Sequence, residues 1–246
     1  MELRYAEFRG LNLTFEVREG IIKHSHDYSA AQHPELAEYL LDLRPPLEAQ
    51  LIDLTDEIAY NTADLDDGFE AKLLRLPHIR ESVPVFERYY KEAEAKYPDA
   101  PDKMKFNEAL KRVLNRFVTD LIENTQRRVS ESGVTTLDEL RRYPERLAAF
   151  SPGVEAERLQ AKRFLGEALY NIKQLEPEKR TAERVITDVF NHLIAHPEAL
   201  PRAYQDRVAT EHLTRVVCDY LGGMTDHYIE DLRKKLLGGK KAETHN

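Results

Sequence analysis

LEAQLIDLTDEIAYNT, residues 47–62, is the stretch that decides the fold. Its apolar residues recur three and four positions apart, which is the period of a helix with one buried side; they are Leu47, Leu51, Leu54 and Ile58. The stretch follows Pro45–Pro46, and proline favours the first positions of a helix. One long helix is therefore predicted from Leu47, with DLDDG at 64–68 either continuing it or beginning a turn.

The same helical period runs through nearly the whole chain, and alternating strand patterns with Asn-Gly or Asp-Gly turns are missing. The fold class is therefore all-α, with many helices. The first helix is expected to begin at Asn12 or Thr14 and to bury Leu13, Val17, Ile21 and Ile22. Further helices are expected from Pro34 and over 83–95, 106–129, 136–143, 159–175, 181–195 and 210–237.

Composition narrows the class of protein. The chain has 246 residues and a formal net charge of -8, which disfavours general binding to a nucleic-acid backbone. Its one cysteine, Cys218, excludes an internal disulfide and fits a small core position, so a reducing, cytoplasmic location is expected. No apolar run approaches the roughly 20 residues that span a bilayer, so no membrane partner is expected.

Three residues on the predicted long helix could carry chemistry. Asp56, Tyr60 and Asp64 are four apart, so each would lie about 6 Å and roughly 40° beyond the last, on a face that Asp53 extends. A carboxylate there can ligate a metal, and a tyrosine and second carboxylate can meet a sugar hydroxyl. On spacing alone, an exposed acidic face is the more frequent explanation.

Other candidates are weaker. His24, His26 and Asp27 in KHSHDYS include a His-Asp dipeptide, but they fall in a polar loop, and His24 also suits a helix end. Arg112 and Arg116, one helical turn apart, could clamp a phosphate, although a solvated face is the commoner reason for such a pair. Asp188, His192 and His196 are four apart, but His196 precedes Pro197 at the end of the predicted helix and no third ligand is evident.

Three segments together resemble one protein family. EAQLIDLTDEIAYNTADLDDG at 48–68 resembles the signature helix of dGTPase-like triphosphohydrolases of the HD superfamily. RYAEFRGLNLTFEVREGIIKH at 4–24 looks like the segment before that helix. LGGMTDHY at 221–228 looks like the close of the family's phosphohydrolase-associated region. The matches occur in the family's order and touch both ends of the chain.

The resemblance implies hydrolysis of a deoxynucleoside triphosphate (dNTP) to deoxynucleoside and inorganic triphosphate, with a divalent metal such as Mg²⁺ or Mn²⁺. It makes Asp56 the last ligand of the H…HD…D metal site, and Tyr60 and Asp64 readers of the deoxyribose. Family members supply the first His and the His-Asp pair ahead of the segment that begins at Gly10, and Ala63 stands where they usually have His. The chain alone is therefore expected to be inactive, as the carboxy-terminal part of such an enzyme.

The resemblance also predicts a division of the chain. Residues 1–80 would close the HD domain, 81–150 would connect, 151–240 would form the associated region and 241–246 a frayed tail, with the Ser151–Gly153 turn as boundary. Expected partners are a dNTP and either further copies of the chain or a missing amino-terminal half. The alternative function is a noncatalytic helical module for nucleotide binding or oligomer contacts.

Overall fold

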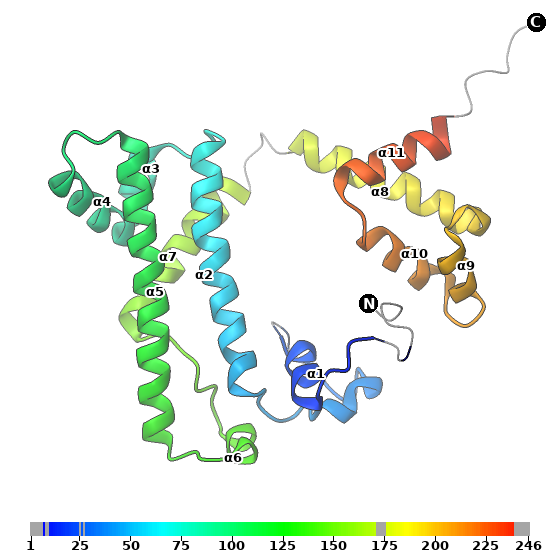
Figure 1. The fold of residues 1–246 in the computed structure, drawn as a ribbon, viewed down its shortest axis with the longest axis horizontal. Coiled ribbons are helices and arrows are strands. Elements are labelled where there is room, and N and C mark those ends of the chain that lie inside the picture. Colours follow the sequence, from blue (N-terminus) through cyan, green and yellow to red (C-terminus); the bar gives the residue numbers. More distant parts are fainter. Residues whose placement is uncertain (1–6, 8–9, 25, 27, 171–175, 239–246) are drawn as a thin grey trace, which may run out of the picture. The chain divides into compact units, whose positions relative to one another are not determined.

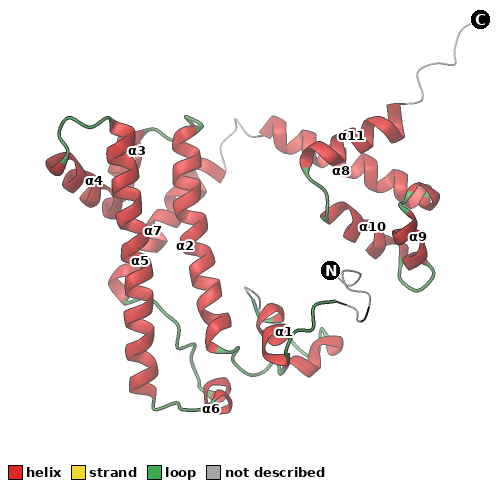
Figure 2. Cartoon of the chain, viewed as in Figure 1, coloured by secondary structure: helices red, strands yellow, loops and turns green. Residues whose placement is uncertain are grey.

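The structure is a computed structural model that describes residues 7, 10–24, 26, 28–170 and 176–238. All regular secondary structure in these residues is helical and no strand occurs among them, so the all-α prediction is confirmed (Figure 2). The chain divides into two compact units, unit 1 over Met1–Asn171 and unit 2 over Ile172–Asn246. This division falls after the Ser151–Gly153 turn, because the helix that begins at that turn packs into unit 1.

Unit 1 is built from seven α-helices and two short turns of other helix types within its described residues (Figure 1). Its elements are α1 (Phe15–Ile22), η1 (Pro34–Tyr39), α2 (Leu47–Glu70), α3 (Leu76–Ser82), α4 (Pro84–Lys96), α5 (Asp102–Ser132), α6 (Leu137–Arg142), α7 (Pro152–Leu165) and η2 (Gly166–Tyr170).

The core of unit 1 lies between α2, α4, α5 and α7. The breaker run YPDAPD at 97–102 ends α4 and lets α5 fold back along it, as the sequence predicts. Rings from three helices then meet in the core: Phe106 lies 4.2 Å from Phe69 and 5.1 Å from Phe86, measured between ring centroids. This packing holds α2 against the α4–α5 pair.

The long helix α2 runs without a break through the DLDDG segment and ends at Glu70. Ile58 and Leu65 are fully buried, while Leu51 and Leu54 are partly buried against the same core. Gln50 fixes the start of the helix, since its side chain donates to the Pro45 carbonyl and accepts from the Leu147 amide. The side of α2 that the sequence predicts to be buried is therefore the side that faces the core.

Helix α1 corrects a prediction about burial. Thr14 caps it as expected, with its hydroxyl accepting from the Val17 amide. However, Val17 is 47% exposed and Ile21 60% exposed. The inward side carries charge instead: Glu19 is fully buried and pairs with Lys23 and with Arg141 of α6. Because this ion network occupies the buried side, Val17 and Ile21 face outward.

Unit 2 contains α8 (Glu176–Ala195), η4 (Pro197–Ala199), α9 (Arg202–Val208), α10 (Leu213–Gly222) and α11 (Asp226–Leu237). Val189 and Leu193 of α8 pack against Val216 and Val217 of α10 in a core of its own.

Two predictions about unit 2 are wrong. The helix expected over 210–237 is two helices, α10 and α11, because the chain breaks at Gly223 and restarts at the Thr225 cap. Cys218 is exposed, since Val216 and Val217 occupy the inward side of α10. The tail expected over 241–246 lies outside the described residues.

Candidate functional site

The outward face of α2 carries the predicted site residues. Because α2 is continuous, Asp56, Tyr60 and Asp64 lie along one face, as their spacing requires. Asp56 is exposed and Tyr60 is 60% exposed. Within the described part of the chain neither side chain makes an ion pair, hydrogen bond or ring contact. Their roles as metal ligand and sugar reader remain predictions.

Two carboxylates of α2 beside this face, Asp53 and Glu57, pair with basic side chains from elsewhere in unit 1. Asp53 Oδ2 lies 2.6 Å from Arg146 Nη1, and Asp53 Oδ1 lies 2.6 Å from His24 Nδ1. Glu57 pairs with Arg158 of α7 and, at 3.0 Å, with Lys162 of α7. These pairs fix the rotation of α2, so that Asp56 faces outward between two neutralised carboxylates.

Tyr170 is a site residue that the sequence did not indicate. Its hydroxyl donates to Asp64, and burial, followed by the effect of Asp64, raises the Tyr170 pKa to about 12. Tyr170 belongs to η2, a π-helical turn that continues α7, and such turns are frequent at functional sites. The wide turn brings the ring to Asp64, 106 positions earlier, which no local pattern could reveal.

A buried amide lies next to Tyr60. Asn61 is 5% exposed, and its Nδ2 has no hydrogen-bond partner within the residues that the structure describes. Buried polar atoms are nearly always paired, and exceptions concentrate where a structure has a function to perform. Asn61 is therefore a further candidate residue, next to Tyr60 in the chain, that the spacing argument did not include.

The described residues do not fit a metal ion by themselves. Across 7, 10–24, 26, 28–170 and 176–238, no three His, Cys, Asp or Glu side chains are placed to hold one. His24 contacts Asp53 rather than Asp56, and the His26 ring lies edge-on to Tyr28. Asp27 lies outside the described residues. Asp56 supplies one carboxylate, and a catalytic site needs about three protein ligands, so no step through a metal is derived.

The two arginines proposed as a phosphate clamp are already paired. Arg112 Nη1 lies 2.7 Å from Glu92 Oε2, and Arg116 Nε lies 3.0 Å from Glu157 Oε2. Both line a surface cavity of about 360 Å³ that also contains Asp120. A phosphate bound there would have to displace these glutamates, so the geometry favours a solvated, ion-paired face.

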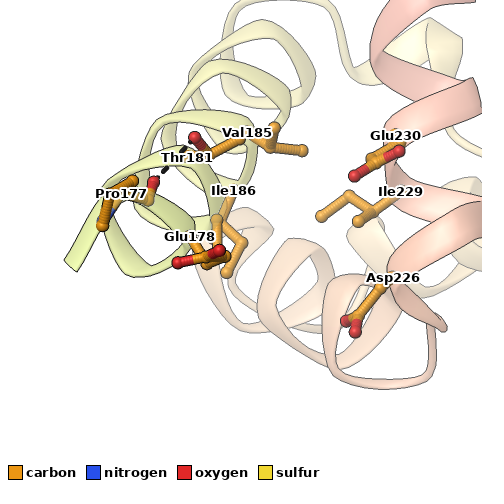
Figure 3. A pocket seen from close by; sticks show the side chains of 9 residues that line it. Pro177, Glu178, Thr181, Val185, Ile186, Asp226, Ile229 and Glu230 are labelled. Atoms are coloured by element: carbon orange, nitrogen blue, oxygen red, sulfur yellow. Dashed lines mark hydrogen bonds between the residues drawn. The ribbon is translucent and has the colours of Figure 1, made fainter. Parts of the chain in front are cut away.

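Unit 2 has a cavity of about 440 Å³ between α8 and α11 (Figure 3). Val185, Ile186 and Ile229 give it apolar walls, and Glu178 and Glu230 stand at its edge. The weak metal candidate on α8 is not assembled: Asp188 pairs with Arg233 at 2.6 Å, and His196 contacts Glu198.

None of the helices described in either unit has the length and apolar character needed to cross a bilayer.

Comparison with known proteins shows which proteins this chain is similar to. Residues 148–235 match the sequence model of the phosphohydrolase-associated domain. The chain is similar to deoxyguanosinetriphosphate triphosphohydrolase-like proteins of Thiobacillus denitrificans (41% identity over 93% of this chain and 60% of the relative), Bordetella pertussis (38%, over 93% and 59%) and Geobacter sulfurreducens (37%, over 96% and 61%).

The similarity extends along almost all of this chain but only part of each relative. The chain spans about 60% of the length of the curated relatives it matches. The predicted resemblance is confirmed: over 93–96% of its length the chain is similar to deoxyguanosinetriphosphate triphosphohydrolase-like proteins, and residues 148–235 match the phosphohydrolase-associated domain.

Proposed function

We propose that this chain forms part of a dNTP triphosphohydrolase, with the outward face of α2 turned to the substrate. The reaction joins a water oxygen to the α-phosphorus and breaks its bond to the 5′ oxygen, which takes up a proton. The products are a deoxynucleoside and inorganic triphosphate. The observation that supports this most is the open Asp56–Tyr60 face, between the paired carboxylates of Asp53 and Glu57.

The chemistry of α2 suits a sugar. The Tyr60 hydroxyl can donate to or accept from a ribose oxygen, and the Asp64 carboxylate can accept from a 3′-hydroxyl. Tyr170 donates to one Asp64 oxygen and leaves the other for such a contact. Asp56, one turn before Tyr60, would lie on the phosphate side as one ligand of the family's divalent metal, Mg²⁺ or Mn²⁺.

The chain alone should release no triphosphate, because no three possible metal ligands come together among the described residues. The test is therefore a chimera in which this chain replaces the matched 60% of the Thiobacillus denitrificans relative. Inorganic triphosphate released from dGTP, dATP, dCTP and dTTP is measured with Mg²⁺ or Mn²⁺, for the chimera and for the chain alone.

The variants locate the activity on α2. Asp56→Ala should abolish triphosphate release by the chimera, while Glu81→Ala, which removes an exposed carboxylate on α3, should leave it unchanged. A folded chimera that releases no triphosphate from any of the four dNTPs would overturn the proposal. Equal activity of the Asp56→Ala and Glu81→Ala chimeras would overturn the role of this face.

A further inference from the structure

An apolar groove of about 630 Å³ lies between α1 and α2 in the described part of unit 1. We call it the α1–α2 groove. Its apolar wall is formed by Val17, Gly20, Ile21, Pro46, Ala49 and Ile52. Three of these side chains are far from buried, with Val17 47%, Ile21 60% and Ile52 55% exposed.

The groove is continuous with the candidate site. Ile52 precedes Asp56 by four residues and Tyr60 by eight, so the three side chains form one stripe along α2. Apolar side chains gathered on one surface, rather than scattered singly, mark contacts with another polypeptide. Single exposed apolar residues elsewhere in unit 1, such as Met104 at 61%, do not line this cavity.

Charge at the rim defines the chemistry of the occupant. Glu16 of α1 and Glu48 of α2 are exposed and line the groove, and neither makes an ion pair within the described chain. Nearby carboxylates behave differently, since Glu19, Asp53 and Glu57 are all paired. The surface therefore complements an apolar ridge flanked by lysine or arginine, which is the pattern of an amphipathic basic helix.

The length of the relatives supplies a source for that helix. This chain matches 60% of the Thiobacillus denitrificans protein, which leaves 40% of the relative outside the match. We propose that the α1–α2 groove is the docking surface for an amphipathic, basic-flanked helix from that remaining sequence. Docking would bury Ile21 and Ile52 and place the helix one turn from Asp56. Its significance for catalysis rests on the proposed function, but the docking itself does not.

Thiol labelling tests the proposal without requiring activity. In a Cys218→Ser background, single Ile21→Cys, Ile52→Cys and Met104→Cys variants are made in the 246-residue chain and in the chimera. Labelling by a maleimide is followed without nucleotide or metal. Labelling at positions 21 and 52 should be at least about tenfold slower in the chimera, because a covered thiol reacts only when its cover opens. Labelling at position 104 should be equal in both.

Charge reversal tests the nature of the occupant. Glu16→Lys combined with Glu48→Lys should restore fast labelling at positions 21 and 52 in the chimera, since basic flanks would then be repelled. If labelling at positions 21 and 52 stays slow after this reversal, the proposal that the docked helix has basic flanks is wrong. If the labelling rates at positions 21 and 52 are equal in the 246-residue chain and in the chimera, the proposal that a helix docks in the groove is wrong.

Concentration separates a second copy from the proposed helix. Labelling of the 246-residue chain that slows as its concentration rises would place a second copy in the groove and overturn the proposal. Chimera labelling that slows as proposed while triphosphate release is absent would sink only the proposed function.

Discussion

The buried ion network under α1 gives the sharpest prediction about stability. Glu19 is fully buried, and its two oxygens lie 2.7 Å from Lys23 Nζ and 2.6 Å from Arg141 Nη2. The Lys23 ammonium also donates to the Leu43 carbonyl at 3.0 Å. The Glu19 carboxylate therefore pairs with both cations and joins α1 to α6. Glu19→Gln keeps the shape of the side chain and removes only its charge.

The expected cost follows from the two cations left behind. Removing one partner of a buried ion pair costs about 3–5 kcal/mol, because the remaining charge stays away from water without compensation. The glutamine oxygen can still accept one hydrogen bond, so we expect a loss of about 3 kcal/mol. This is a large part of the 5–15 kcal/mol that typically separates folded and unfolded domains.

Urea unfolding followed by circular dichroism measures this loss, and hydrogen exchange locates it. The amides of α1 should lose protection before those of α4 and α5, which lie in the main core. Glu16→Gln is the matched control, since Glu16 is exposed on the same helix and has no partner in the described chain; it should change stability by less than about 0.5 kcal/mol. Equal effects of the two substitutions would refute this account of α1.

Three further predictions concern packing, pH and the sugar-facing site. Gly68→Ala should lower the unfolding free energy by about 1–3 kcal/mol in urea titrations, because its Cβ would lie 2.7 Å from Leu74 Cδ1, whereas Gly153→Ala, with nothing within 4 Å, should not. Burial of the Tyr90 side chain, followed by the nearby Asp102 carboxylate, raises the Tyr90 pKa to about 12, so stability that is present below pH 10 should be lost as pH rises toward 12. In thermal melts, Tyr90→Phe should flatten that decline, and parallel curves for the two proteins would contradict it. Tyr170→Phe should lower the unfolding free energy by no more than about 1 kcal/mol, because the ring is half-exposed. In the chimera it should raise KM for dNTPs more than it lowers kcat, and an unchanged KM would remove Tyr170 from the site.

The sequence by itself determined the fold class and the elements that carry the candidate site. Helical periodicity gave α2 and its core side, and the proline-rich break at 97–102 gave the α4–α5 hairpin, because both depend on neighbouring residues. The four-residue spacing placed Asp56, Tyr60 and Asp64 on one face for the same reason. The three quoted segments indicated the resemblance that the comparisons confirm.

Only the tertiary structure decided which side of α1 is buried, because Glu19 is buried by Arg141, 122 positions away. It also paired Tyr170 with Asp64 and left Asp56 and Tyr60 open between the paired Asp53 and Glu57. Such contacts join residues far apart in the chain, and periodicity within one helix carries no information about them.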